Sequence, residues 1–404
     1  MRALRAFVIA GAGAGAFLLF LAVESLVLDA RLKRIPVRVG VTGTRGKSSV
    51  TRLIAGALRE SGIRVLAKTT GSRAVLILPD GSEREIRRRG LPTVLEQKRV
   101  VRLAARLGAR ALVTEMMSVR EECLSAESKF LIRPNVLVVT NVRLDHIDLM
   151  GETREEIAAS MVSAFPRNGI VVVPEEEALP VFTERATRLG TKLVLARTDL
   201  ARATGRGPGP AGGVFEKNLR LAAEAARVLG VEDAAARRGM SGARPDFGSL
   251  KAWDAPGGGT GWPIGFVNAF AANDPDSTRE ALSGILDEPG LSGRILLGLL
   301  NLRWDRGDRT LQWARAFEEG AFDMFGYVAL IGGQARAFAC RMGRTPTGRN
   351  GRFLVLRERS PERIFRTLAA LATGPAFVVG MGNIGGPGVA IVEHWERTGI
   401  PHGL

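Results

Sequence analysis

Cysteine, histidine and tyrosine are scarce in this chain. Its 404 residues include only two cysteines, Cys123 and Cys340, three histidines and one tyrosine. The cysteines lie far apart and form no CxxC pair, which argues against a disulfide framework or a zinc site and fits a reducing compartment. Basic residues are not interleaved with aromatic ones, which argues against a nucleic-acid-binding surface. Extended low-complexity stretches are also absent, so the composition is that of a globular protein.

Acidic residues are fewer than basic ones. The chain has 57 Lys and Arg residues against 41 Asp and Glu residues, which gives a formal net charge of +16. Such a field attracts polyanions, and an acidic membrane surface, nucleotides and an anionic polymer are equally compatible with it. An arginine-rich composition without functional meaning is the plain alternative. A nucleic-acid-binding protein would bind DNA with a steep salt dependence, which we do not expect here.

One long hydrophobic run is present, and it lies at the N-terminus. Residues 7–23 carry no charged or strongly polar side chain, and the stretch from Leu4 to Leu28 is long enough to cross a hydrocarbon core of about 30 Å. Basic residues after the run outnumber those before it, which places the downstream side in the cytoplasm. We therefore predict a transmembrane helix with a basic flank over residues 1–34, in a single-pass cell-membrane protein whose catalytic part is cytoplasmic. A cleaved signal peptide is the alternative.

A glycine-rich loop follows a β-branched strand pattern at residues 37–42. Residues 43–49 read Gly-Thr-Arg-Gly-Lys-Ser-Ser, and a helical pattern comes next. In such a loop the backbone N–H groups wrap phosphate oxygens, Lys47 neutralises their charge and the Ser48 hydroxyl ligates Mg²⁺. The usual phosphate loop has a further glycine where this chain has Val41. The residues predicted to bind ATP phosphates are Gly43, Thr44, Arg45, Gly46, Lys47, Ser48 and Ser49.

Strand and helix patterns alternate along the remaining chain. The first series of strand patterns is at 63–66, 109–114, 135–140, 169–173 and 192–196, with a hairpin pattern at 73–90. A second series runs from 264 to 379, after a glycine-rich stretch at 257–261. The alternation predicts α/β domains with doubly wound parallel sheets, whose ligands bind at the carboxyl ends of the strands. We predict a P-loop domain over 35–245 and a Rossmann-like α/β domain over 246–404.

Polar side chains follow two strands of the first series. Glu115 comes after the strand at 109–114, where a nucleotide-binding sheet presents a carboxylate toward Mg²⁺. The strand at 135–140 is followed by Asn141, Asp145, His146 and Asp148. An imidazole and carboxylates there can hold a second cation and orient a phosphoryl acceptor. A solvated loop is the plain alternative in both places.

A second glycine-rich loop, residues 380–388, reads Gly-Met-Gly-Asn-Ile-Gly-Gly-Pro-Gly and follows a strand pattern. It invites a dinucleotide-binding interpretation. We set that interpretation aside because no acidic residue follows a later strand and because Pro387 would break the expected helix.

Six ordered motifs resemble the Mur ligase family of ATP-dependent amide-bond ligases, which includes folylpolyglutamate and cyanophycin synthetases. The motifs are the loop at 43–48, Glu115, residues 141–148, the helix led by Lys217 and Asn218, the segment 242–247 with Arg244, and residues 268–277. The similarity extends over residues 35–400. Within the family, the chain is most similar to the membrane-associated poly-γ-glutamate synthases. The features that carry this similarity are the N-terminal helix, the lack of a substrate-binding domain before the loop, residues 301–309 and the loop at 380–388.

The resemblance implies roles for single residues. Lys47, Glu115 and His146 would be catalytic, and Ser48, Glu115 and His146 would hold the metal. Asn141, Asn218 and Arg244 would contact the nucleotide. The carbamoylated lysine that cell-wall ligases often carry after the histidine has no counterpart, because Ser160 lies near that place and no lysine occurs between Lys129 and Lys192. Three arginines would hold acceptor carboxylates, namely Arg303, Arg306 and Arg309.

The reaction implied by the resemblance is the ATP-dependent polymerisation of glutamate into poly-γ-glutamate through an acyl phosphate. Its cofactors would be ATP and Mg²⁺, with Mn²⁺ as an alternative metal. Its partners would be glutamate, polyglutamate, the membrane and small membrane subunits of the PgsC (CapC) and PgsA (CapA) types, with a homo-oligomer left open and no nucleic acid. Two alternatives stand beside it: a P-loop ATPase that energises polymer export, and a ligase of the folylpolyglutamate or cyanophycin type.

Overall fold

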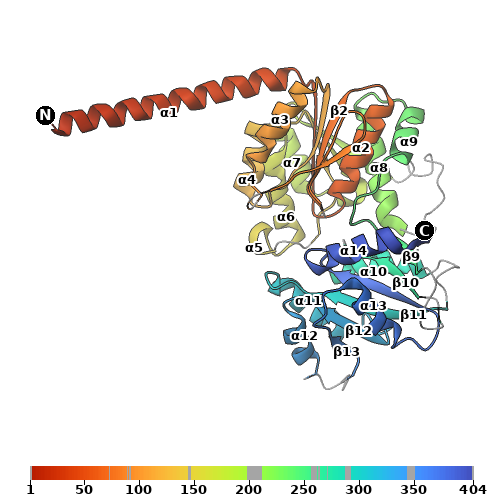
Figure 1. Ribbon diagram of the computed structural model, residues 1–404. Coiled ribbons are helices and arrows are strands. Elements are labelled where there is room, and N and C mark those ends of the chain that lie inside the picture. The colour runs from red at the N-terminus through yellow and green to blue at the C-terminus, as the bar shows by residue number, and fades with distance from the viewer. Residues whose placement is uncertain are drawn as a thin grey trace. The chain divides into compact units, whose positions relative to one another are not determined.

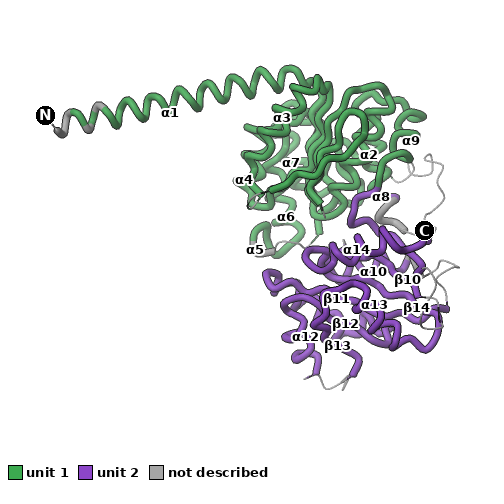
Figure 2. The backbone as a smooth tube through the Cα atoms, in the orientation of Figure 1, with its two compact units in different colours: residues 1–204, 217–244 green, residues 205–216, 245–404 purple. Residues whose placement is uncertain are grey.

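The computed structural model describes residues 2–71, 73–88, 90, 92–143, 147–197, 212–255, 262, 264–270, 272–286, 293–343 and 351–402. The chain divides into two compact units, shown in Figure 2. Unit 1 consists of Met1–Thr204 and Lys217–Arg244, and unit 2 consists of Gly205–Glu216 and Pro245–Leu404. Each unit contains one β-sheet with helices around it (Figure 1).

The N-terminal helix α1, Arg2–Lys33, packs against the rest of unit 1 only through its C-terminal end, as far as the described side chains show. Its portion Ile9–Lys33 is long and apolar enough to cross a membrane, by length and composition. The large apolar side chains from Phe17 to Val27 are exposed, whereas Leu28 and Leu32 are buried in a cluster with residues of α3, Glu96–Arg106. Two ion pairs reinforce this contact, Lys98–Glu24 at 2.7 Å and Arg133–Asp29 at 2.6 Å. The last turns of α1 are therefore part of the packing of unit 1.

Unit 1 is built on an eight-stranded sheet in the order β4-β3-β2-β5-β1-β6-β7-β8, counted among the described residues. The six strands from β2 to β8 in this order run parallel, and β3 and β4 form an antiparallel hairpin at one edge. The strands are β1 Val37–Thr42, β2 Val65–Thr69, β3 Val75–Ile77, β4 Glu83–Glu85, β5 Ala111–Glu115, β6 Val136–Val139, β7 Ile170–Pro174 and β8 Lys192–Ala196. The predicted parallel sheet and its hairpin are confirmed.

The helices of unit 1 lie between these strands in the chain or follow the last of them, and residues 212–216, which begin one of the later helices, belong to unit 2. Their bounds are α2 Lys47–Glu60, α4 Glu121–Ala126, α5 Ile147–Met150, α6 Arg154–Met161, α7 Pro180–Leu189, α8 Gly212–Val228 and α9 Asp233–Ser241, with a π-helix at Glu127–Ile132 and short 3-10 turns at Val162–Ala164 and Glu175–Glu177. The predicted glycine-rich stretch at 201–213 lies largely outside the described residues. Helix α9 is not foreseen from the sequence, because its buried face consists mainly of small residues, Ala235, Ala236 and Gly239 with Met240, which give a weak hydrophobic pattern.

Helices α2 and α9 approach each other at two glycines. A Cβ atom on Gly239 would lie 2.6 Å from the carbonyl carbon of Gly56 and 2.8 Å from the Cα atom of Ala57. We expect Gly239→Ala to lower the free energy of unfolding by about 1–3 kcal/mol, because the helices must separate to admit the methyl group. Thermal melting checks this, with Gly307→Ala as the control, since a Cβ there meets nothing within 4 Å. Equal losses in both variants would contradict the close approach.

Unit 2 contains a seven-stranded sheet in the order β13-β12-β11-β14-β10-β9-β15, again among the described residues. Five strands, from β13 to β10, are parallel, and β9 is antiparallel to both of its neighbours. The strands are β9 Lys251–Asp254, β10 Ile264–Asn268, β11 Ile295–Asn301, β12 Tyr327–Ile331, β13 Phe353–Val355, β14 Ala376–Gly382 and β15 Ile400–His402. The helices are α10 Pro275–Leu286, α11 Gly307–Glu318, α12 Ala335–Met342, α13 Pro361–Ala369 and α14 Pro387–Thr398.

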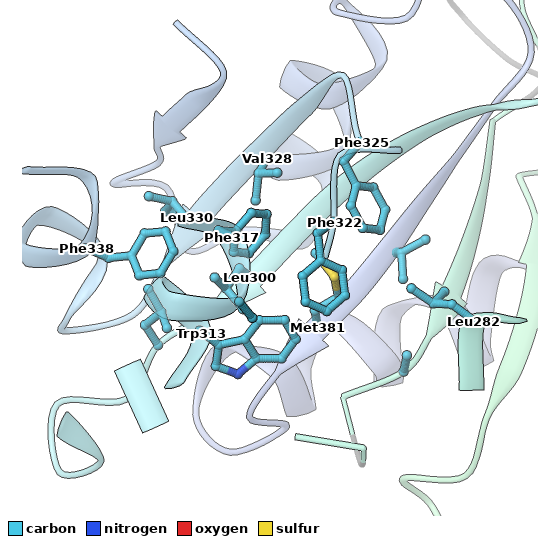
Figure 3. Close-up of a cluster of buried hydrophobic side chains, with 14 of the residues drawn as sticks. Leu282, Leu300, Trp313, Phe317, Phe322, Phe325, Val328, Leu330, Phe338 and Met381 are labelled. Carbon is cyan, nitrogen blue, oxygen red and sulfur yellow. The ribbon is translucent and has the colours of Figure 1, made fainter. Parts of the chain in front are cut away.

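Aromatic side chains fill one face of the unit 2 sheet. Trp313 and Phe317 of α11 lie with Phe322 against the strands, as Figure 3 shows. The ring centroids of Trp313 and Phe322 are 5.1 Å apart, and those of Phe317 and Phe322 are also 5.1 Å apart. Burying rings of this size supplies much of the hydrophobic stabilisation of a domain. This core holds β11 and β14 in place, and it thereby fixes the loops at their carboxyl ends.

The prediction that Pro387 would break the helix after the second glycine-rich loop is wrong. Helix α14 begins at Pro387, where the missing N–H group costs no hydrogen bond and the fixed φ suits a first helical residue. The dinucleotide interpretation still lacks support. The strand that follows, β15, pairs with β9 and not with β14, so no acidic residue is carried to the neighbouring strand end.

Candidate functional site

The glycine-rich loop joins the end of β1 to the start of α2. Gly43 has a φ of 123° and Gly46 a φ of 77°, a left-handed region that side chains disfavour. A Cβ on Gly43 would lie 2.9 Å from the backbone nitrogen of Thr140, and one on Gly46 would lie 2.5 Å from Oδ1 of Asn218. Both glycines are therefore required by backbone geometry and by neighbours. Asn218, far along the chain on α8, lies directly against the loop.

Asn141 clamps the loop from the end of β6. Its Oδ1 atom accepts hydrogen bonds from the Thr44 hydroxyl at 2.6 Å and from the Arg45 N–H group at 3.0 Å. Its Nδ2 atom donates to the Arg45 carbonyl at 3.2 Å. The N–H group of Arg143 also donates to the Thr44 hydroxyl, at 3.0 Å. These bonds hold the loop against the sheet, so that its backbone is set before any ligand binds.

Lys47 lies at the first position of α2 and folds back over the loop. Its Nζ atom donates to the carbonyl oxygens of Gly43 at 2.7 Å and of Thr44 at 3.3 Å. The ammonium group is thus held against the backbone of the glycine turn. At this place a phosphate oxygen would meet the ammonium, the N–H groups of the loop and the positive end of α2 together.

Ser48 and Glu115 meet although 67 residues separate them. The Ser48 hydroxyl donates to Oε2 of Glu115 at 2.7 Å, and the Thr70 N–H group donates to the same oxygen at 2.6 Å. Both side chains are buried. The described residues hold no cluster of three or more His, Cys, Asp or Glu side chains suited to a metal. A hydroxyl and one carboxylate, completed by phosphate oxygens and water, nevertheless fit Mg²⁺.

A buried polar network supports the strand that carries Glu115. Lys68, at the end of β2, is fully buried and lies 2.7 Å from Glu96. Gln97 donates to the Glu115 carbonyl at 3.5 Å and to Oε1 of Glu127 at 2.5 Å. Burial lowers the pKa of the Lys68 ammonium, although the charge of Glu96 opposes this. Our sequence interpretation missed these residues. The signal was a lysine two residues after the apolar strand pattern at 63–66, in a strand that extends to Thr69.

Glu96 should make stability depend on pH. Burial alone would raise its pKa, but hydrogen bonds and charges from Arg88 and Lys68 outweigh burial and lower the pKa from 4.5 to about 2. A lowered pKa stabilises the fold above the unfolded value of 4.5, and this stabilisation is lost as the pH falls toward 2. We expect a loss of about 2–3 kcal/mol from this group.

The measurement is the unfolding free energy of the detergent-solubilised chain across this pH range. Glu96→Gln should have a flatter profile than the unmodified chain. The exposed carboxyl of Glu184 provides a matched control, and Glu184→Gln should leave the profile unchanged. Parallel profiles for the unmodified chain and Glu96→Gln would show that Glu96 does not contribute in this way.

The other predicted site residues lie in three places. Asp145 and His146 are outside the described residues, as is the side chain of Asp148, so the predicted cluster after β6 stays a prediction apart from Asn141. Arg244 is exposed, in the segment that follows α9. Ser160 is buried on α6. The structure thus gathers the loop, Glu115, Asn141 and Asn218 at the carboxyl edge of the unit 1 sheet.

The three arginines predicted to bind an acceptor follow β11 in unit 2. Arg303 forms a two-point ion pair with Asp305, with contacts of 2.8 and 2.5 Å. Arg306 contacts Asp308 at 3.4 Å. Arg309 is buried and donates to the Asn273 carbonyl at 3.0 Å. The first two guanidinium groups reach the surface, whereas the third is engaged inside the unit.

The family was identified from the following matches. Residues 41–201 match the model of the Mur ligase middle domain, and residues 257–398 match that of the poly-γ-glutamate synthase CapB C-terminal domain. The PGA synthase CapB of Bacillus subtilis (strain 168) is 37% identical over 283 residues, which are 69% of this chain and 71% of that protein. The chain belongs to the CapB family of poly-γ-glutamate synthases.

A second CapB relative and two solved structures extend this result. The capsule biosynthesis protein CapB of Bacillus anthracis is 39% identical over 288 residues, which are 70% of this chain but only 61% of that protein. MurF from Acinetobacter baumannii superposes with a TM-score of 0.64 at 14% identity, covering 93% of this chain and 79% of its own. Mycobacterium tuberculosis folylpolyglutamate synthase complexed with ADP also has a TM-score of 0.64, at 16% identity, covering 91% and 92%. These structures show that this CapB family chain shares the Mur ligase fold.

Proposed function

We propose that the protein is an ATP-dependent amide ligase that polymerises glutamate into poly-γ-glutamate through an acyl phosphate. The observation that carries the proposal is the Ser48–Glu115 pair beneath a preformed phosphate loop, in a chain of the CapB family. A hydroxyl and a carboxylate at a phosphate loop are the ligands needed for a nucleotide-bound Mg²⁺. The family match supports this substrate class, because the matched C-terminal model is named for poly-γ-glutamate synthase and the two relatives for capsule biosynthesis and PGA synthesis.

The proposed chemistry begins with transfer of the terminal phosphoryl group of ATP to the γ-carboxylate of a glutamate or of a growing chain end. A carboxylate alone has a poor leaving group, and its phosphorylation provides a better one. The loop N–H groups and Lys47 stabilise the charge that develops on the transferred group. Ser48 and Glu115 would hold Mg²⁺, or Mn²⁺ as an alternative, which supplies further charge neutralisation. Asn141 fixes the loop, while Asn218 and Arg244 would contact the nucleotide.

The second half of the reaction is attack by the amine of an incoming glutamate on the acyl phosphate, with release of phosphate. We propose that Arg303 and Arg306 bind the carboxylates of this glutamate, since their guanidinium groups reach the surface of unit 2 and already hold carboxylates two residues away. Arg309 would instead position the loop that contains Asn273. His146 would complete the metal site, as the family resemblance implies.

The protein would act at the cytoplasmic face of the cell membrane. Helix α1 is apolar and exposed over most of its length, which supports a single-pass anchor. Small membrane subunits of the PgsC (CapC) and PgsA (CapA) types are the proposed partners that would receive the polymer, and glutamate and polyglutamate are the proposed substrates. A net charge of +16 favours contact with a polyanionic product and with acidic lipids.

The test incubates membranes carrying the full chain with ATP, Mg²⁺ and glutamate, and measures ADP, phosphate and polymer. The expected result is one ADP and one phosphate for each γ-amide bond formed. Release of ADP without any new amide bond would reject the ligase and favour an ATPase that energises export. A product that contains other amino acids or folate would favour the other ligase types.

A further inference from the structure

The cytoplasmic boundary of the proposed membrane span can be placed along α1. A hydrocarbon core of about 30 Å takes about 20 helical residues, so a span that begins after Arg5 ends within one turn of Glu24. Glu24 is also the first charged residue after the apolar run. The layer of lipid headgroups would therefore surround α1 just beyond Glu24.

The folded part of unit 1 contacts α1 at this level. The Lys98 ammonium of α3 lies 2.7 Å from Glu24, and Arg133, which follows the π-helix Glu127–Ile132, lies 2.6 Å from Asp29. Both contacts are within about two helical turns of the boundary. In Figure 1, α3 and α4 lie on the side of unit 1 toward which α1 projects. The start of α3 and the π-helix therefore meet the headgroup layer.

Two exposed apolar side chains lie on these elements. Phe130 of the π-helix is 63% exposed, and Leu95, the N-cap residue of α3, is 56% exposed. The other large apolar side chains that are exposed in the described part of unit 1 outside α1 are less so, Leu149 at 38% and Leu195 at 37%. Water penalises such groups, whereas the boundary between headgroups and acyl chains accepts them.

Exposed basic side chains accompany them. Arg99 and Arg102 are exposed on α3, and Lys129 is exposed on the π-helix. None of the three has an ion pair among the described residues. The exposed acids Glu121 and Glu122 begin α4, about two turns before Lys129. The acidic residues of α3, the π-helix and the end of α1 are ion-paired or buried, namely Glu24, Asp29, Glu96 and Glu127.

We propose that Leu95, Arg99, Arg102, Lys129 and Phe130 form a headgroup surface, which lies on the cytoplasmic leaflet and binds acidic phospholipids. The spacing of Leu95, Arg99 and Arg102 places them on one face of the helix. Apolar side chains at the acyl boundary and basic side chains at lipid phosphates are the pattern of a membrane-surface contact. The inference rests on the proposed anchoring by α1 and not on the ligase reaction. The contact fixes the orientation of unit 1 on the membrane.

The sequence allows an optical test. All five tryptophans lie between residues 253 and 395, in unit 2, so a tryptophan added to unit 1 can be measured above the signal of the unmodified chain. The full chain with Phe130→Trp is reconstituted alone into vesicles of phosphatidylcholine and phosphatidylglycerol, with acyl chains brominated near the headgroup. Bromine quenches a tryptophan only on close approach. The added emission therefore reports contact of residue 130 with the acyl boundary.

We expect the added emission of Phe130→Trp to be quenched. Arg238→Trp, at an exposed position on α9, should not be quenched, because α9 and α2 cover the face of the sheet opposite α3 (Figure 1). High salt, or vesicles of phosphatidylcholine alone, should weaken the quenching at residue 130.

A charge variant tests the headgroup contact. The salt concentration is set so that about half of the Phe130→Trp reporter is quenched. Adding Arg99→Gln should then lower the ratio of quenched to unquenched reporter about fivefold, as expected for one basic side chain at an acidic surface. Arg238→Gln is the matched control on α9 and should leave the ratio unchanged.

Three results would overturn the proposal in vesicles that carry the chain, as flotation shows. Absence of quenching at residue 130 would exclude contact with lipid and leave the surface for a protein partner. Equal quenching at residues 130 and 238 would mean that unit 1 turns no particular face to the bilayer. Quenching that ignores salt, acidic lipid and Arg99→Gln would reject headgroup binding. If Phe130→Trp does not fold, Leu95→Trp on the same surface decides.

The two proposals fail in different ways. If the chain floats with the vesicles and residue 130 is quenched but no polymer is made, the ligase proposal fails and the headgroup surface stands. If polymer is made and the chain floats without quenching at residue 130, the surface alone is rejected. A chain that does not float with the vesicles at all would reject both the anchor and the surface.

Discussion

Replacing Lys47 with alanine should reduce ATP-dependent polymer synthesis by about 10²–10³-fold. The Lys47 ammonium lies against the glycine turn, where it donates to the carbonyls of Gly43 and Thr44. Loss of a preorganised group that stabilises transition-state charge has an effect of this size. The assay is the initial rate of ADP release with saturating glutamate and Mg²⁺, together with the yield of polymer.

A matched control separates this effect from a loss of folding. Lys192 is an exposed lysine on β8 in the same unit, and Lys192→Ala should retain full activity. Both variants should melt close to the unmodified chain, because the Lys47 ammonium donates to backbone carbonyls of its own loop. Polymer synthesis that survives Lys47→Ala would refute the proposed mechanism.

Replacing Glu115 with glutamine should lower the rate of ADP release by about 10²–10³-fold at low millimolar Mg²⁺, the equivalent of several kcal/mol of transition-state stabilisation. Glutamine keeps the size of the side chain and an acceptor for the Ser48 hydroxyl and the Thr70 N–H group, but it removes the negative charge that Mg²⁺ requires. Part of the activity should therefore return as the Mg²⁺ concentration is raised.

The Mg²⁺ dependence distinguishes a metal ligand from a structural carboxylate. Glu115→Gln should shift the Mg²⁺ concentration for half-maximal ADP release upward, while Glu184→Gln, an exposed substitution on α7, should leave it in place. An equal fractional loss at every Mg²⁺ concentration would mean that Glu115 supports the fold of the loop and does not hold the metal.

Many elements could be predicted because their hydrophobic patterns are local. The strand β8 occupies the range 192–196 that its pattern indicates, since it is a short apolar run between turn residues. Helix α9 and the small strand β9 could not be found in this way. The first is a short segment rich in alanine, and the second has only four residues and pairs on one side with β15, a strand that the local sequence does not identify. Helix α14 was missed because proline was treated as a helix breaker, although it is favourable at a first position.

The sequence by itself determined the phosphate loop. A glycine turn, a lysine and a serine in one contiguous segment, between a strand and a helix, are enough to predict a triphosphate cradle, since the backbone of that segment does the binding. The same holds for the apolar helix α1, whose length and composition alone indicate a membrane span. The ordered motifs also sufficed to place the chain in its family.

Only the tertiary structure decided which distant residues complete the site. Strand order β2-β5-β1-β6 brings the Glu115 carboxylate to Ser48 and the Asn141 amide to the loop, while α8 presses Asn218 onto Gly46. The fold also engages Arg309 inside unit 2. The physical reason is that hydrophobic periodicity specifies which face of an element is buried, whereas strand order and the partners of each polar group depend on packing between segments far apart in the chain.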